Sequence, residues 1–146
     1  MGYRFSLATV LRFREIAESR EELMLEMLMG EIARTRRRIE QAQLEICAAR
    51  EARTTAMREP LPAFHIQGML NDMAAAEERC KSLLETLESL EQRRVIQMQK
   101  YQAAHRDRKM LSDMAARQHD AYELDRARAQ QKALDDLFAA RAQRNN

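Results

Sequence analysis

The sequence predicts an all-α protein: a long antiparallel two-helix coiled-coil hairpin whose second helix overhangs the first at the C-terminal end. Three observations predict this fold: few turn-forming residues, one proline break, and apolar residues spaced as in coiled coils. Only 3 glycines and 2 prolines occur among 146 residues, whereas charged residues make up 33% of the chain. Ala, Glu, Arg, Leu, Gln and Met dominate, and this composition is typical of long helices.

The one strong break in the helical pattern lies at Pro60 and Pro62. Proline removes a backbone donor and biases the residue before it away from the helical region. We therefore expect a first helix over about residues 6–58, a turn over 59–63 and a second helix over about 64–141. A chain of 146 residues is expected to form a single coiled-coil domain over residues 1–146.

Apolar side chains recur at alternating steps of three and four residues on both sides of this break. That spacing is the period of a left-handed coiled coil. We call the line along which the two helices would pack together the seam. In the first helix the predicted seam positions are Leu25, Leu28, Ile32, Thr35, Ile39, Ala42, Ile46, Ala49, Arg53 and Ala56. In the second helix they are Met69, Met73, Ala76, Cys80, Leu83, Leu87, Leu90, Arg94, Gln97, Tyr101, Ala104, Arg108, Leu111, Ala115, Gln118 and Tyr122.

The register of the hairpin follows from the residue numbers, because facing residues in an antiparallel pair have numbers that add to a constant. Ile39 and Leu83 add to 122. The same sum comes from Ile32 with Leu90, Ala42 with Cys80, Ile46 with Ala76, Ala49 with Met73, Leu11 with Leu111 and Leu7 with Ala115. Half of 122 is 61, and Leu61 lies between the two prolines. The seams and the turn, read separately, therefore predict the same hairpin.

The same sum predicts an overhang, because the first helix has no residue left to face the second beyond about Gln118. The segment 118–141 would extend as a single helix of roughly 35 Å. It still contains apolar residues, namely Tyr122, Leu124, Leu134, Leu137 and Phe138. Isolated helices are marginally stable in water, so an unpaired helix with apolar residues indicates a missing partner.

A polar zone interrupts the predicted seam. Arg14 would face Arg108, and Glu18 and Glu21 occupy seam positions. Gln97 would face an apolar residue of the first helix. Like charges that face each other are unfavourable, so a change of register is one expectation for this zone.

The sequence has no motif typical of catalysis or of cofactor or metal binding, so we expect that the protein is not an enzyme and binds no cofactor and no metal. No glycine-rich phosphate loop occurs, the three histidines are scattered, and Cys47 and Cys80 match no metal or redox spacing. The net charge of +2 favours no nucleic-acid partner. Charged residues interrupt every apolar run, so we expect no signal peptide and no direct membrane insertion. A reducing cytosol is the expected compartment.

Two surface features each leave two interpretations open. The basic cluster Arg34, Arg36, Arg37 and Arg38 is either a solvated helix face or a docking site for an acidic partner. Apolar residues crowd the turn, and they form either a cap that closes the hairpin or an exposed tip that binds a partner. These residues are Met57, Phe64, Ile66, Met69, Leu70 and Met73.

Both ends of the chain resemble the flagellar export protein family FliJ. Near the N-terminus, Phe5, Leu7, Val10, Leu11 and Arg14 follow the family pattern Phe-x-Leu-x-x-Val-Leu-x-x-Arg. The closing run is similar to the family's C-terminal signature, with Arg117 to Tyr122 followed by Glu123, Arg126, Gln131, Lys132, Leu134, Asp135, Asp136 and Arg141. The proline turn also lies where the hairpin of that family turns.

The resemblance implies a stalk-like component of the flagellar type III export apparatus, similar to the central stalk of rotary ATPases. Implied partners are the export ATPase hexamer, the cytoplasmic part of the export-gate membrane protein, and export chaperones. ATPase contacts are expected at Phe5, Leu7, Val10, Leu11, Arg14, Gln131, Lys132, Leu134 and Asp135. Export-gate contacts are expected at Met69, Met73, Ala76 and Cys80.

The resemblance also implies a cytoplasmic protein that is held at the inner face of the cell membrane through its partners. Two alternatives share the predicted fold. One is the equivalent stalk protein of a virulence type III secretion system, and the other is a structural coiled-coil scaffold without an ATPase partner.

Overall fold

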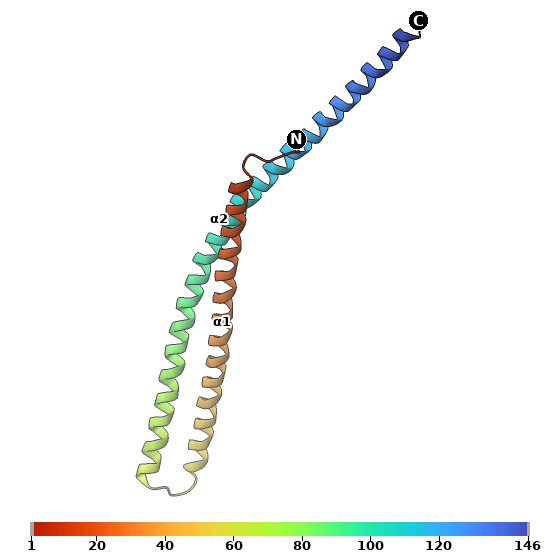
Figure 1. Ribbon diagram of the computed structural model, residues 1–146. Helices are drawn as coiled ribbons and strands as arrows, with labels where there is room; N and C mark the ends of the chain where they lie inside the picture. The colour runs from red at the N-terminus through yellow and green to blue at the C-terminus, as the bar shows by residue number, and fades with distance from the viewer. Residues whose placement is uncertain (1, 146) are drawn as a thin grey trace. The chain divides into compact units, whose positions relative to one another are not determined.

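The computed structural model describes residues 2–145 and confirms the all-α hairpin. Helix α1 (Ala8–Ala56) has 49 residues, helix α2 (Ala63–Arg144) has 82, and the two helices pack antiparallel (Figure 1). No strand occurs among the described residues. The observed helix bounds compare with sequence expectations of about residues 6–58 and 64–141.

Backbone hydrogen bonds explain where both helices stop and start. At the end of α1, the amides of Arg58 and Glu59 bond to carbonyls three residues earlier, which tightens the last turn. The carbonyl of Pro62 then accepts bonds from the amides of His65 and Ile66 and opens α2. Proline suits this position, because the first amides of a helix have no partner within it. The proline break therefore gives the turn that the sequence predicted.

Contacts divide the chain into two compact units, which are described separately below. The hairpin unit is Glu21–Tyr101, and it contains the turn. The terminal unit combines residues up to Arg20 with residues from Gln102 onward. Each unit contains a part of α1 and a part of α2.

The core of the hairpin unit is a single seam of side chains between the two helices. Ile39, Ala42 and Cys80 form one buried cluster, and Leu83 packs against it. Leu28, Ile32 and Leu90 form a second cluster, against which Leu87 packs. Three predicted pairs whose numbers add to 122 lie in these clusters, so the register of this unit is confirmed: Ile39 with Leu83, Ala42 with Cys80, and Ile32 with Leu90.

The hairpin unit contains one buried polar seam residue from the predicted polar zone. Gln97 is only 5% exposed, as is expected of a residue on the seam. Its side-chain amide donates to the backbone carbonyl of Glu21 at 3.0 Å and also to the Glu21 carboxylate. A buried amide is tolerated when its hydrogen-bonding groups are satisfied, so the seam keeps its period at this level. The register change considered for this zone does not occur in the hairpin unit.

In the terminal unit, the N-terminal part of α1 packs along α2. Leu111 is buried in the seam, and Phe5 is buried just before α1 begins. The ring of Tyr3 lies beside His119, and these two residue numbers also add to 122. The N-terminal residues and this part of α2 therefore pack together inside the terminal unit.

Candidate interaction surfaces

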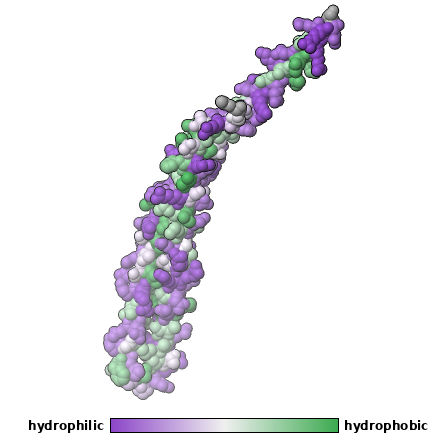
Figure 2. Space-filling model, viewed as in Figure 1, coloured by the Kyte–Doolittle hydropathy of each residue, from purple (hydrophilic) through white to green (hydrophobic). Residues whose placement is uncertain are grey.

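The last part of α2 presents apolar side chains to solvent. Every residue from Glu123 to Asn145 is exposed, and four of them are large and apolar. We call these four residues the distal stripe: Leu124, Leu134, Leu137 and Phe138. Figure 2 shows hydrophobic side chains among hydrophilic ones along this part of α2. A helix in water gains little from such residues unless another surface covers them, so the distal stripe is a candidate binding surface.

The distal stripe lies on a different side of α2 from the seam. Continuing the seam spacing beyond Tyr122 leads to Asp125, Ala129, Lys132 and Asp136, most of which are charged. The stripe starts two residues further along, at Leu124. Steps of three and four residues then lead through Leu134 to Phe138. Two residues of an α-helix correspond to a rotation of about 200°. A partner of the stripe would therefore approach α2 from the side opposite α1.

Residues that precede α1 cover the seam side of α2 in the terminal unit. The hydroxyl of Tyr3 donates a hydrogen bond to the carbonyl of Ala115 at 3.3 Å. Its ring centroid lies 5.2 Å from the ring centroids of both His119 and Tyr122. Such aromatic contacts add stability beyond the area they bury. Pairing along α2 therefore reaches Tyr122, somewhat beyond the limit expected from the sequence.

Glu18 is the centre of an ion-pair cluster in the terminal unit. Its side chain is 14% exposed, and Arg108 donates to both carboxylate oxygens. The Nδ1 atom of His105 lies 2.9 Å from one of these oxygens. The hydrogen bonds from Arg108 and then His105 lower the pKa of Glu18 below its ordinary value of 4.5. Arg14 pairs with Asp107 at 3.3 Å, so the two arginines that face each other are each neutralised.

The turn exposes its apolar side chains and does not pack them into a cap. Phe64 is 72% exposed, and its ring contacts that of His65 at a centroid distance of 4.6 Å. Met57 is also exposed, and Met69 and Met73 are partly exposed. This exposure favours the second of the two interpretations of the turn, an apolar tip that can contact a partner.

The basic cluster on α1 has mixed surroundings. Arg36 forms an ion pair with Glu91 of α2 at 2.6 Å, and the guanidinium of Arg37 bonds to the carbonyl of Ala33. Arg34 and Arg38 are exposed. Part of the cluster thus closes one edge of the helix pair, and part faces solvent.

The described residues contain no group of three or more His, Cys, Asp and Glu side chains that could hold a metal ion. Neither helix, over the part of the chain that is described, has an apolar stretch long enough to cross a membrane. Cys80 is buried in the seam and Cys47 is exposed.

A comparison with known protein families accounts for the terminal motifs. The family described as "Flagellar FliJ protein" matches residues 3–146, which is essentially the whole chain. The chain belongs to the FliJ family. No curated protein and no solved structure matches the chain. Membership confirms the resemblance seen in the terminal motifs and gives the protein a role connected with flagellar export.

The N-terminal FliJ motif lies on the packed side of the terminal unit. Phe5 is buried, Leu7, Leu11 and Arg14 are half-buried, and Val10 is exposed. Most of these side chains therefore hold α1 against α2. Among the five, Val10 offers the most accessible apolar surface.

The C-terminal FliJ motif starts inside the paired region, where Tyr122 is half-buried, and is exposed from Glu123 onward. Gln131 and Leu134 share the side of the distal stripe, whereas Lys132 falls on the seam side. The amide of Gln131 donates to the carboxylate of Asp135 at 2.9 Å. The two terminal motifs thus belong to one compact unit, but most of the second lies beyond the stretch of α2 against which the first packs.

The four residues expected at the export gate divide into two kinds. Ala76 and Cys80 are buried between the helices, so their side chains contribute to the seam. Met69 and Met73 are partly exposed near the turn. The gate contact at these four positions stays a prediction, with the two methionines as its accessible part.

Sequence reasoning missed two features of the terminal unit. The contacts of Tyr3 with His119 and Tyr122 were missed because Tyr3 precedes the helix and has no helical period. The cluster around Glu18 was missed because long side chains reach partners one turn from the facing position. A signal was present, since Glu18 and Arg108 carry opposite charges and both occupy seam positions.

Proposed function

We propose that this FliJ family protein binds the flagellar export ATPase ring through its terminal unit. We also propose that the apolar turn binds the cytoplasmic part of the export-gate membrane protein. Through these contacts the protein supports flagellar protein export as a binding component and not as a catalyst. Its place of action is the cytoplasmic side of the membrane, where it is held by its partners, with export chaperones as further partners.

The observation that supports ATPase binding best is the unpaired distal stripe. Leu134 and Phe138 project from the part of α2 beyond Tyr122, where every described residue is exposed. A ring with a central opening surrounds such a helix on all sides. It could therefore cover the stripe on one side and the charged residues Lys132 and Asp136 on the other. An inserted helix of this kind needs no partner within its own chain.

Truncation of the chain after Glu123 tests this proposal. The truncated protein keeps Tyr122 and its contact with Tyr3, so its melting temperature should stay close to that of the full chain. Stimulation of the purified export ATPase should be lost, and motility should be reduced. Full stimulation by a truncated protein that remains helical would place the ATPase contact elsewhere.

Point variants sharpen the test by comparing the distal stripe with an exposed apolar residue outside the proposed contact. The double variant Leu134→Ala, Phe138→Ala should weaken ATPase binding at least about tenfold, since large apolar contacts dominate interfaces. Leu44→Ala is the matched control, because Leu44 is an exposed apolar residue of the hairpin unit, outside the proposed ATPase contact. Equal losses from both changes would argue against a stripe-specific contact.

A charge variant tests the other side of the proposed contact. Lys132→Glu should weaken binding to an acidic surface of the ring, and this effect should shrink as salt screens the charge. A loss of binding that does not depend on salt would show that the charge of Lys132 is not what the ring recognises.

The turn supports the proposed gate contact through its exposed apolar side chains. Phe64 is the most exposed aromatic residue of the turn region, and Met69 and Met73 lie on the following turns of α2. Phe64→Ser with Met69→Ser should reduce binding to the purified cytoplasmic part of the gate protein and leave ATPase stimulation intact. A structural scaffold, the remaining alternative, predicts neither binding nor stimulation.

A further inference from the structure

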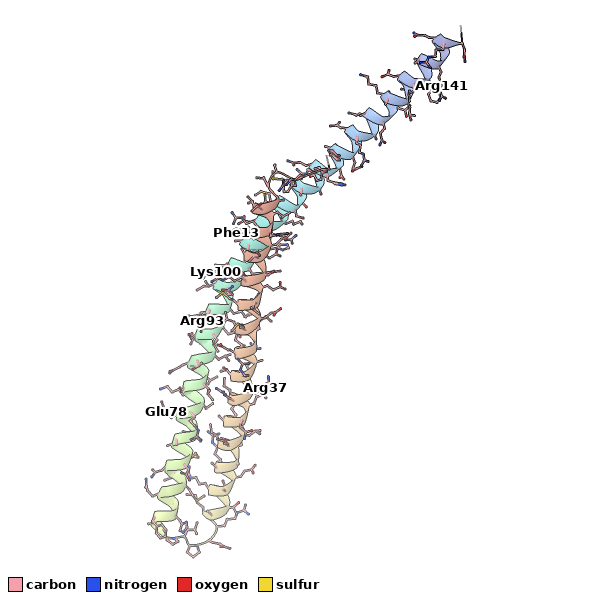
Figure 3. All side chains as sticks on the ribbon, viewed as in Figure 1. Phe13, Arg37, Glu78, Arg93, Lys100 and Arg141 are labelled. Atoms are coloured by element: carbon pink, nitrogen blue, oxygen red, sulfur yellow. The ribbon has the colours of Figure 1, made fainter. Side chains whose placement is uncertain are left out.

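A groove on one edge of the hairpin unit is lined by residues of both helices. It encloses about 280 Å³ between Met24, Met27 and Glu31 of α1 and Arg93, Ile96 and Lys100 of α2. The buried side chains of Leu28 and Gln97 form its floor. Figure 3 labels Arg93 and Lys100 on the α2 side. This groove lies outside the turn and the terminal unit, to which the proposed function assigns its contacts.

The groove lies where an expected cross-helix ion pair is missing. Nearer the turn, Glu45 of α1 pairs with Arg79 of α2 at 3.4 Å, and their residue numbers add to 124. Glu31 and Arg93 add to the same number and therefore occupy equivalent facing positions. They form no ion pair, and the groove lies between them. Both charges are thus available to a third group.

The opposite edge of the same helix pair also has a cavity, of about 270 Å³, but ion pairs occupy the cations beside it. There Glu91 accepts ion pairs from Arg36 at 2.6 Å and from Arg94 at 2.9 Å, and Arg50 lies 3.8 Å from Glu77. By contrast, neither Arg93 nor Lys100 has an ion pair among the described residues. The two edges therefore differ, and only one presents unpaired cations next to apolar side chains.

The side chains in the groove match the requirements of a third helix. Met24, Met27 and Ile96 are exposed, and methionine adapts its shape to different apolar partners. In helical assemblies, apolar residues of the incoming helix fill such a groove while flanking charges pair with residues at its edges. Both cations lie on the α2 side, so the incoming helix needs carboxylates along that flank.

We propose that this groove binds an amphipathic helix of a partner protein whose apolar face is flanked by Glu and Asp residues. The apolar face contacts Met24, Met27 and Ile96. The acidic flank pairs with Arg93 and Lys100. The groove is a third interaction surface of the protein, separate from the proposed ATPase and gate contacts.

Two labelled synthetic helical peptides test the proposal. The acidic peptide has leucines at steps of three and four residues and glutamates along one flank, and the basic peptide has the same leucines with lysines in place of glutamates. The full-length protein should bind the acidic peptide at least about tenfold more tightly than the basic one by fluorescence anisotropy. Equal affinity for the two peptides would overturn the proposal.

Charge reversal in the groove gives the sharper test. Arg93→Glu with Lys100→Glu should lose affinity for the acidic peptide and gain affinity for the basic peptide. Arg37→Glu with Lys81→Glu changes the net charge equally at exposed positions that do not line the groove, and should leave both affinities unchanged. A variant that is merely unfolded cannot gain affinity for the basic peptide. The change of preference from the acidic to the basic peptide therefore separates recognition from folding.

Two other outcomes would assign the groove to a different occupant. Self-association of the protein, measured by light scattering and abolished by the Arg93, Lys100 double variant, would make it an interface with a second copy. Binding to vesicles of anionic lipid that the same variant abolishes, without any binding of the acidic peptide, would make it a lipid contact. Either result overturns the proposal.

Discussion

Glu18 shows how a single carboxylate can stabilise a seam position that looks unfavourable. Arg108 and His105 both bond to it, and little of its side chain reaches solvent. A carboxylate in this setting favours its charged form, so its pKa is lowered. Because the folded pKa lies below the unfolded one, the stabilisation is complete above about 4.5 and is lost as pH falls through the lower, folded value.

Replacement of Glu18 tests this account at the scale of one residue. Glu18→Gln should lower the unfolding free energy by about 1 kcal/mol at neutral pH, because the charged hydrogen bonds to Arg108 are weakened. The difference from the wild type should shrink in acid, as the wild-type carboxylate becomes protonated. Denaturant melts at several pH values measure it. Glu15→Gln, at an exposed position, is the control and should show no such trend.

Residues in the terminal unit mark the limit of what the sequence could predict. The positions of Glu18 and Arg108 on the seam followed from the period of the helix. Their pairing did not, because flexible side chains choose among partners above and below the facing position. Tyr3 was beyond prediction for a different reason, since no repeating pattern fixes the path of residues before a helix.

At the scale of the helices, the seam was predictable in detail. Ile39, Leu90 and Leu111 are buried, and each had been assigned to the seam from spacing alone. Packing between two helices depends on a local period, which a single sequence displays directly. The exposed stripe on the last part of α2 has the same period. Its unpaired state followed from the sum of residue numbers, and its side of α2 followed from continuing the seam spacing, whereas the exposure of its side chains emerged only with the structure.

Shortening one side chain on the seam measures how much the seam contributes to the free energy of unfolding. Ile39→Ala should lower the unfolding free energy by roughly 2–4 kcal/mol, the range for buried large-to-small changes. Leu44→Ala is the matched control on the same helix, because Leu44 is exposed. It should change stability by no more than about 0.5 kcal/mol. Thermal melts that respond equally to the two changes would contradict the assigned seam.

At the scale of the whole molecule, the hairpin requires that the two residues of each facing pair belong to the same chain. With Cys47→Ser and Cys80→Ala to remove the native thiols, cysteines introduced by Ile39→Cys and Leu83→Cys should form a disulfide within the chain. These positions pack in one cluster, and facing seam residues come within disulfide reach. Non-reducing gels distinguish this product from a covalent dimer, whose exclusive formation would contradict the hairpin.

The fixed sum of facing residue numbers also restricts how such a chain can change length in evolution. Loss of one residue from one arm turns all seam positions beyond it by about 100°. Loss of seven residues from one arm turns the seam positions back toward the other arm, but it displaces the two arms by about 10 Å along their axes. Only the loss of equal numbers of residues from facing positions of both arms keeps the seam residues turned toward each other and the same pairs opposite each other. The described residues of α2 beyond Tyr122 are all exposed and pack against no part of α1, so the length of this tail is free of this coupling. The reach of the tail can therefore follow the dimensions of a partner while the hairpin keeps its own.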